Sequence, residues 1–427
     1  MIKNFKAIAV SPSRQKSLKI VEAGLAAIKT NNIIKKSIRR KGNQLIIKNK
    51  KFNLKKVKHL YIVAIGKCSF DAILPLEKIL GQKLTAGIAL DVKTPPKFKK
   101  VKGFKGTHPM PSSQNISVTK KILQLLNGLN KEDLVIFLIS GGGSTLLCAP
   151  YEKTYRQESA ILQSLFEAGA PIREINTIRK HISRARGGQL SKHAYPARVI
   201  SLIFSDVPGD DLSFVASGPT IQDTTTTDDA ERILDKYSIL KRSNLKECKL
   251  IETPKEEKYF KKTTNIILVS NKDALDAMAK EAQKLGLKSK ICDFCLAGEA
   301  RVVGEEIVEV LNSVPAKTAL LYGGETTVTI KTKLKGGRSQ ELVLAALLKI
   351  QKGQTVVAFA SDGRDNTDFA GAICDIITLE KTKKSKLDPK KFLSKNNSYD
   401  FFKKIGDYIL TGRTGSNVSD LVIAIKE

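Results

Sequence analysis

The chain has 427 residues, of which 41% are hydrophobic, and this is enough for two or three compact domains with ordinary cores. No stretch approaches the roughly 20 apolar residues of a membrane-spanning helix, and the first residues lack a signal-peptide pattern, so we expect a cytoplasmic protein. The formal net charge of +31 admits nucleic acid as a partner, but the lysines are scattered and no zinc-finger, leucine-zipper or aromatic RNA-binding pattern accompanies them.

Short β-branched runs alternate with longer segments of helical period, which is typical of an α/β protein with largely parallel sheets. The predicted strands are residues 60–65, 133–139 and 197–204 in the first half, and 265–269, 318–322, 355–360 and 408–412 in the second. Residues 240–263 are polar and lack a strand pattern, so we place the boundary between two lobes there. Beyond it, Ser270 and Asn271 can cap a helix that stops at Gly286.

Glycine-rich or charged loops follow nearly every predicted strand. In open parallel sheets, ligands bind outside the carboxyl ends of the strands, where helix N-termini offer free N–H groups to anions. The loops in question are Gly66-Lys67, SGGGS at 140–144, SDVPGDD at 205–211, GGET at 323–326, SDGRDNTD at 361–368 and RTGSN at 413–417.

The SGGGS loop has two readings of equal weight. Its glycines can take positive φ and approach a ligand closely, so their N–H groups would form a nest for phosphate or carboxylate, with two serine hydroxyls at its rim. The plainer reading is a tight turn between strand and helix. The loop is neither a GxGxxG dinucleotide fingerprint nor a Walker A sequence.

Two basic residues stand at the ends of predicted elements. Lys67 directly follows a buried strand, so we expect its amine at the mouth of the sheet rather than on a solvated face. There it would neutralise charge that develops on a transferred phosphoryl group. Arg338 lies at the start of the predicted helix 340–350, where a guanidinium and the helix dipole would act on the same anion.

Residues 176–188 have a helical pattern with two isoleucines on one face and four basic residues on the others, Arg179, Lys180, Arg184 and Arg186. The favoured reading is an amphipathic helix with a solvated basic face. Arg179 is the candidate anion ligand, because a guanidinium matches a carboxylate or phosphate in bidentate fashion. His181 is read as a structural residue rather than a base.

Carboxylates also gather after strands. Asp206, Asp210 and Asp211 lie within six residues and would repel one another without a cation, which makes Mg²⁺ ligation a reasonable hypothesis. For at least one of them, a helix cap or turn is the alternative reading. The same two readings apply to Glu325, Asp362 and Asp365.

These components, taken together, are those of phosphoryl transfer, in which positioning and charge stabilisation carry catalysis. Nine segments in order over about residues 60–421 also resemble the glycerate 2-kinase family, which is distinct from the glycerate kinases that make 3-phosphoglycerate. They read AIGKCSFDA, GTHPMPSSQ, LISGGGSTLL, EINTIRKHISRARGGQL, SDVPGDDLSFVASGPT, GGETTVTI, GGRSQELVLA, ASDGRDNTDFAGA and TGRTGSNVSDL.

The resemblance implies ATP-dependent and Mg²⁺-dependent phosphorylation of D-glycerate to 2-phosphoglycerate. It implies a larger Rossmann-like amino-terminal domain, residues 1–255, and a smaller α/β carboxy-terminal domain, residues 256–427, with the active site in the cleft between them. Lys67 and Arg338 match basic positions that the family is thought to use in catalysis, and Arg179 joins them as our candidate for the acceptor's carboxylate. Our chemistry, laid on the matching segments, assigns phosphate or nucleotide to Ser140, Gly141, Gly142, Gly143, Ser144, Gly323 and Gly324, and metal to Asp206, Asp210 and Asp362.

Several positions depart from the expected family pattern, namely Ser339, Ser361, Asn366 and Arg413. They leave the acceptor open between glycerate and a related short hydroxy acid. A hydroxypyruvate reductase is a second hypothesis, although the nicotinamide cofactor that it needs has no GxGxxG unit to bind. A nucleic-acid-binding module is the third, and it predicts steeply salt-dependent binding. The favoured reading has a small-molecule substrate, no membrane or specific nucleic acid, and a homodimer as one option.

Overall fold

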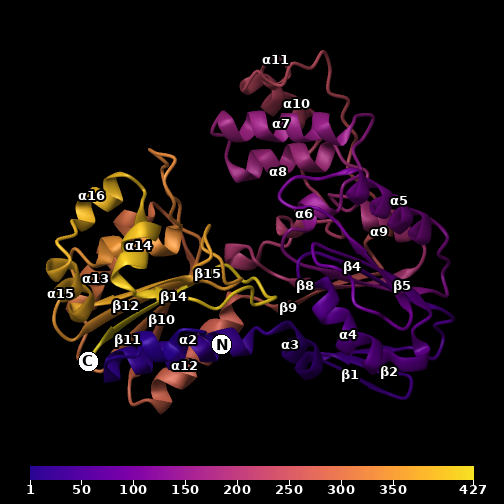
Figure 1. The fold of residues 1–427 in the computed structure, drawn as a ribbon. Helices are drawn as coiled ribbons and strands as arrows, with labels where there is room; N and C mark the ends of the chain where they lie inside the picture. The colour runs from indigo at the N-terminus through magenta and orange to yellow at the C-terminus, as the bar shows by residue number, and fades with distance from the viewer. The chain divides into compact units, whose positions relative to one another are not determined.

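The fold is described by a computed structural model that covers residues 1–427, except for the side chain of Pro208 (Figure 1). The chain forms two compact units. The parallel-sheet unit contains Ile33–Ser205 and Asp211–Leu268, and the mixed-sheet unit contains Met1–Asn32, Asp206–Asp210 and Val269–Glu427. The predicted domains, residues 1–255 and 256–427, differ from these units and remain a prediction.

The main sheet of the parallel-sheet unit has six strands: β4 (Leu60–Ile65), β5 (Ala86–Asp91), β6 (Val101–Lys105), β7 (Leu134–Ile139), β8 (Arg198–Phe204) and β9 (Thr263–Val269). Their order across the sheet is β6-β5-β4-β7-β8-β9, and the pairs from β6 to β8 are parallel. Every residue of β7 is buried. A continuous apolar run such as LVIFLI is what a parallel strand covered on both faces requires.

Helices of this unit form two groups. Those nearest the sheet are α4 (Ser69–Leu80), α5 (Ser113–Asn127), α6 (Gly143–Leu146) and α9 (Gln189–Ala194). A separate layer with its own apolar core contains α7 (Tyr155–Glu167), α8 (Ile172–His181), α10 (Thr227–Lys236) and α11 (Ile239–Arg242), as Figure 1 shows. Short 3₁₀ turns occur at η1 (Gly81–Lys83), η3 (Val215–Ser217) and η4 (Glu257–Tyr259). After α3 (Thr30–Ser37), a small antiparallel sheet is made of β1 (Ile38–Lys41), β2 (Gln44–Ile47) and β3 (Lys50–Asn53).

The sheet of the mixed-sheet unit contains β10 (Lys288–Leu296), β11 (Thr318–Gly324), β12 (Gln354–Ala360), β13 (Gly371–Asp375), β14 (Tyr408–Ile409) and β15 (Asp420–Lys426). Their order is β10-β11-β15-β12-β13-β14, and β10 with β11 is the parallel pair among four antiparallel ones. Because β15 runs antiparallel to both neighbours, the carboxyl ends of β11 and β12 meet its first residue. Gly324 and Ala360 both pair with Asp420.

The helices of this unit are α1 (Phe5–Ile8), α2 (Pro12–Ala27), α12 (Asn271–Lys284), α13 (Ala300–Ser313), α14 (Arg338–Ala346), α15 (Ile376–Lys384), α16 (Pro389–Ser394) and α17 (Ser398–Ile405), with a 3₁₀ turn η2 (Pro208–Asp210). Figure 1 shows α2 and α12 on one face of the sheet and α13 and α14 on the other. A Cβ on Gly24 of α2 would lie 2.7 Å from the sulfur of Met278 in α12, so the two helices pack too closely for a larger residue. The amino-terminal helix therefore belongs to the mixed-sheet unit.

Several sequence predictions need correction. The strand at 265–269 was predicted in the second lobe, but as β9 it extends the parallel sheet beside β8. The second sheet is mixed rather than largely parallel, because β15 inserts between β11 and β12. The helix predicted through 188 ends at His181, and the strand predicted at 408–412 reduces to Tyr408–Ile409.

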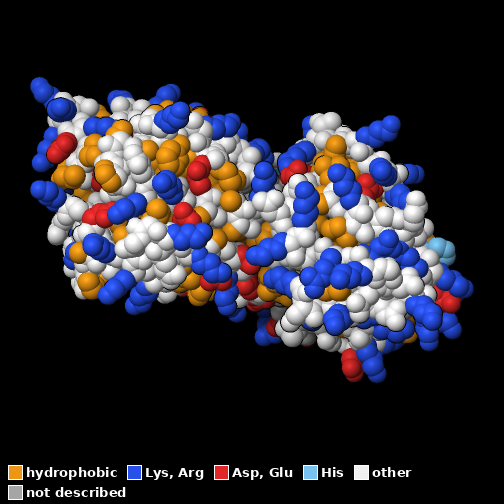
Figure 2. All heavy atoms as spheres, turned by 90° about the horizontal axis from the view of Figure 1, so that it is seen from below, with side chains coloured by type: hydrophobic (Ala, Val, Ile, Leu, Met, Phe, Trp, Pro, Cys, Tyr) orange, Lys and Arg blue, Asp and Glu red, His pale blue; other side chains and the backbone are white. Residues whose placement is uncertain are grey.

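Other predictions are confirmed. The side chain of Ser270 caps α12 in a capping box with Asp273, and the chain leaves the helix before Gly286, whose φ is +80°. None of the helices among the described residues is long and apolar enough to cross a membrane. Figure 2 shows lysine and arginine side chains spread over the visible face among uncharged ones, as the scattered lysines of the sequence indicate.

Candidate active site

Lys67 and the glycine loop 140–144 lie together at the carboxyl ends of β4 and β7, which are neighbouring parallel strands. The backbone N–H of Lys67 donates to the carbonyl oxygen of Gly141 at 3.0 Å. Gly142 has φ +81°, and a Cβ there would lie 3.1 Å from both Cγ and Cε of Lys67. The side chain of Lys67 therefore runs over the middle glycine, and it is only partly buried.

The other loop residues serve packing as well. A Cβ on Gly143 would lie 2.6 Å from the Cβ of Ala216, and Ser140 is buried against the end of β4. Ser144 is partly exposed, and its hydroxyl lies 3.2 Å from that of Ser217. The tight-turn reading thus accounts for Ser140 and Gly143. Gly142 and Ser144 are partly exposed, and phosphate binding by the loop remains a prediction.

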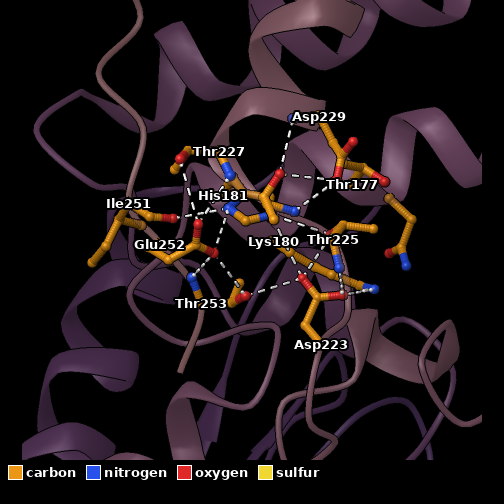
Figure 3. Close-up of polar contacts among 12 residues, drawn as sticks. Thr177, Lys180, His181, Asp223, Thr225, Thr227, Asp229, Ile251, Glu252 and Thr253 are labelled. Carbon is orange, nitrogen blue, oxygen red and sulfur yellow. Dashed lines mark hydrogen bonds and ion pairs between the residues drawn. The ribbon is translucent and has the colours of Figure 1, made fainter. Parts of the chain in front are cut away.

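The basic residues after Ile175 are not a solvated face, and this corrects the favoured reading. Figure 3 shows Lys180 in an ion pair with Asp223, 2.8 Å apart and buried. Arg186 is 1% exposed and pairs with Glu158 at 2.8 Å. Buried cations need such partners, since an unpaired charge in an apolar interior is costly. Of the four basic residues, Arg184 is the exposed one.

His181 has the structural role that the sequence predicts. It is completely buried, its Nδ1 lies 3.0 Å from the carbonyl oxygen of Ile251, and its Nε2 lies 3.2 Å from the hydroxyl of Thr225 (Figure 3). Both ring nitrogens are therefore occupied, and the histidine ties α8 to two loops.

Arg179 differs from its neighbours. It lies in the last turn of α8 and borders a cavity of about 250 Å³. Within the described part of the chain, its guanidinium makes no hydrogen bond or ion pair. Burial, together with the nearby charge of Arg186, lowers the pKa of Arg179 to about 10.

Arg338 is the centre of a charged cluster in the mixed-sheet unit. It is the first residue of α14, and its Nη2 donates to Glu325 Oε1 at 2.8 Å and to Asp420 Oδ1 at 3.2 Å, while its Nε donates to Asp420 Oδ2. Glu325 follows β11 and Asp420 begins β15, so the strand register brings the two carboxylates together. The Nη1 group of Arg338 makes no hydrogen bond to a described residue, so its two N–H groups can serve a ligand.

Asp365 stabilises this cluster through hydrogen bonds to the start of α14. It is 3% exposed and accepts hydrogen bonds from the backbone N–H groups of Ser339 and Gln340, at 3.1 and 2.8 Å. A Cβ on Gly337 would lie 2.1 Å from its carboxyl carbon, so the glycine permits this approach. Asp365 is therefore a cap that fixes the start of α14 and the position of Arg338.

Negative charge exceeds positive charge in this cluster. Burial raises the pKa of Glu325 to about 7, and the charges of Asp420 and Asp206 add to this effect against Arg338. Burial and the charge of Asp420 likewise raise the pKa of Asp365 to about 7. A bound cation would relieve this excess of negative charge.

The predicted metal ligands are distributed over the same unit. Asp206 lies 3.2 Å from the side-chain amide of Asn417, Asp362 accepts a hydrogen bond from the backbone of Arg364 at 2.9 Å, and Asp210 lies near Cys295. Among the described residues, no group of three or more His, Cys, Asp or Glu is arranged to hold a metal ion. Mg²⁺, however, often takes only one or two protein carboxylates and completes its shell with substrate phosphates and water. The carboxylates near Asp420 fit a metal held in this way, and the assignment remains a prediction.

Gly323 and Gly324 are explained by packing. A Cβ on Gly324 would lie 2.2 Å from the carbonyl oxygen of Leu296, and one on Gly323 would lie 2.9 Å from Asn271 Nδ2. Their contact with a nucleotide remains a prediction. The sequence does not single out Asp420, because it begins a strand, whereas the residues expected to bind ligands follow strands.

Comparison with known proteins covers nearly the whole chain. Residues 16–252 match a family described as a domain of unknown function (DUF4147), and residues 318–420 match the MOFRL family. A glycerate 2-kinase of Pyrococcus horikoshii is 36% identical over 435 residues, which are 96% of this chain and 97% of that protein. The crystal structure of a glycerate kinase from Thermotoga maritima superposes with a TM-score of 0.83 at 31% identity, covering 97% of this chain and 100% of that one. A protein of Agrobacterium vitis that carries the unverified name hydroxypyruvate reductase is 39% identical over 332 residues, 74% of this chain and 76% of its own length.

Proposed function

This chain belongs to the glycerate 2-kinase family, and we infer that it transfers a phosphoryl group to the 2-hydroxyl of D-glycerate, giving 2-phosphoglycerate. The structural observation that best supports this function is the position of Lys67. Its side chain runs over Gly142 at the carboxyl ends of two parallel strands. Phosphoryl transfer needs such a cation beside a loop of backbone N–H groups, because charge develops on the phosphoryl oxygens.

We further propose that ATP is the phosphoryl donor and that Mg²⁺ is the metal. Bound Mg²⁺ would neutralise and orient phosphate oxygens. Asp206 and Asp362 are the residues proposed to hold it, and the excess of negative charge around Asp420 supports this assignment. Arg338 is held on one side by Glu325 and Asp420, so its free Nη1 edge would bind a donor phosphate in a fixed orientation.

Four other candidate residues would act on the acceptor. The Lys67 ammonium stabilises the phosphoryl group as it reaches the acceptor hydroxyl, and Gly142 and Ser144 supply hydrogen bonds beside it. Arg179 would hold the carboxylate of the acceptor. We place the enzyme in the cytoplasm, where a nucleotide donor is available.

A hydroxypyruvate reductase is the second candidate, and the name of the Agrobacterium vitis relative favours it. It needs a nicotinamide cofactor, and the loop after β7 lacks the third glycine of a dinucleotide fingerprint. Quenching or a shift of NADH fluorescence on titration, with no effect of an ATP analogue, would support this candidate over the kinase.

The test is a coupled assay of the full chain with ATP, Mg²⁺ and D-glycerate, in which enolase is the first coupling enzyme and no mutase is added. Only 2-phosphoglycerate gives a signal under these conditions, so a signal supports both the reaction and the position of transfer. ADP release without an enolase signal would contradict transfer to the 2-hydroxyl. Absence of ADP release with D-glycerate and with other short hydroxy acids would contradict the kinase.

A further inference from the structure

A cavity of about 250 Å³ lies within the parallel-sheet unit, bordered by α7, by the last turn of α8 and by residues 109–111. Its wall has an apolar side and a charged side. Leu162 and Phe166 of α7 form an apolar side, and Arg179 and Glu158 form a charged side. Ser144 of the glycine loop also borders it, so the cavity opens beside the loop over which the side chain of Lys67 runs.

The group formed by Arg179, Arg186 and Glu158 has one positive charge in excess. Two guanidinium groups, those of Arg179 and Arg186, share the single carboxylate of Glu158, and that carboxylate pairs with Arg186 at 2.8 Å. Arg179 is left without a hydrogen-bond partner among the described residues. A partly buried guanidinium in this state favours an anionic ligand, because the ligand replaces the water that the cation has lost.

Glu158 and Arg186 hold the end of α8 in place. Both are 1% exposed, and Arg186 Nη1 donates to the carbonyl oxygen of Arg179 itself at 3.5 Å. Glu158 thus anchors, through Arg186, the backbone from which the Arg179 side chain extends. Glu158 Oε2 is buried without a hydrogen-bond partner, so the pair is not fully satisfied by the protein alone.

We propose that this cavity is the carboxylate subsite for a short 2-hydroxy acid, with Arg179 as the ligand of the carboxylate and Glu158–Arg186 as the pair that positions it. The proposal rests on the proposed function and deepens it. Ser144 borders the same cavity, and the side chain of Lys67 runs over Gly142, two residues before Ser144. The proposed function supplies the class of acid, in which the hydroxyl lies on the carbon next to the carboxylate.

The first experiment compares two acceptors and two variants. D-glycerate and its uncharged amide, D-glyceramide, are assayed with the full chain, with Arg179→Met and with Arg156→Met, a control that removes an exposed arginine of α7. Arg179→Met should lower kcat/KM for D-glycerate about 30-fold or more, because truncating one partner of a charged pair costs about 2–5 kcal/mol. It should leave kcat/KM for D-glyceramide and the KM for ATP within about threefold, and the control should change none of these. Equal losses for both acceptors would overturn the role of Arg179.

The positioning pair has a separate readout. Glu158→Gln keeps the shape of the side chain but removes its charge, so the end of α8 should loosen and the preference for D-glycerate over D-glyceramide should fall about five- to tenfold. If Glu158 had a merely structural role, kcat/KM for the two acceptors would fall in proportion, through loss of active protein. An unchanged preference in soluble, folded Glu158→Gln would overturn the positioning role.

Calorimetric titration of D-glycerate onto the full chain, without nucleotide, separates this inference from the proposed function. Binding to wild type that is lost in Arg179→Met supports the subsite even where no ADP is released, an outcome that would refute the kinase alone. Normal turnover of D-glycerate by Arg179→Met would leave the kinase standing and refute the subsite. Equal binding by wild type and Arg179→Met would do the same.

Discussion

Arg14 and Asp407, 393 residues apart in the chain, form a buried bidentate ion pair in the mixed-sheet unit. Arg14 Nη1 and Nη2 donate to the two carboxylate oxygens of Asp407 at 2.8 and 3.0 Å, and the same guanidinium binds Asp375 at 2.7 and 2.8 Å. Burial opposes the charged form, but the bonds to Asp375 and Asp407 hold the pKa of Arg14 above its usual value. This cluster ties α2 to the far end of the sequence.

Arg14→Met should lower the free energy of unfolding by about 3–5 kcal/mol, because it leaves two buried carboxylates short of a cation. Lys16→Met is the matched control, since Lys16 pairs with Glu427 on the surface with 32% and 30% of the side chains exposed. Its loss should be about 0–1 kcal/mol. Urea unfolding of both variants measures the difference, and equal losses would contradict the assignment.

Lys67→Ala should reduce kcat about 10²–10³-fold, the usual effect of removing one preorganised donor from a transition state. The fold should be preserved, because the Lys67 side chain runs over a glycine and is only partly buried. Steady-state kinetics and far-UV circular dichroism are the measurements. Lys78→Ala, on the exposed side of α4, is the control expected to keep full activity. Full turnover by Lys67→Ala would refute its catalytic role.

Gly142→Ala should damage activity more than stability. The residue has φ +81°, which costs an alanine about 1–2 kcal/mol, and the new Cβ would lie 3.1 Å from two carbons of Lys67. Gly169→Ala carries a similar strain at φ +71° but meets nothing within 4 Å. The two variants should therefore lose similar thermal stability, while kcat falls only in Gly142→Ala. A similar kcat in both would show that the position of the lysine side chain is unimportant.

Glu325→Gln should change how stability depends on pH. The pKa of Glu325 is raised to about 7 in the folded state, whereas a free glutamate titrates near pH 4.3. Between about pH 4 and 7 the native state thus holds a proton that the unfolded chain has released, so the free energy of unfolding falls as the pH rises. Glutamine cannot release that proton, and the fall should be smaller in the variant.

Urea unfolding at pH 5 and pH 8 tests this prediction. The free energy of unfolding should still fall somewhat with rising pH in Glu325→Gln. The variant keeps Asp365, whose pKa is also raised to about 7. The same difference between the two pH values in wild type and variant would show that Glu325 has an ordinary pKa.

Local sequence was sufficient for the features that depend on a few consecutive residues. A strand followed by Gly66-Lys67, the SGGGS loop and Arg338 at a helix start are each read within one short segment, because strand, turn and capping preferences act over a few residues. The ordered segments also carried the family resemblance, and with it the reaction. The close approach of the Lys67 side chain to Gly142 could not be predicted from the sequence, since it depends on two strands that are neighbours only in space.

The tertiary structure decided which charged side chains pair with one another. Asp420 meets Arg338 because β15 inserts between two strands that precede it in the chain, and Arg186 is buried because α7 brings Glu158 to it. The sequence by itself therefore determined the class of enzyme and the loops that we propose to carry its chemistry. Only the fold determined which charges are paired and which, such as that of Arg179, have no partner among the described residues, because pairing depends on packing and register between segments far apart in the chain.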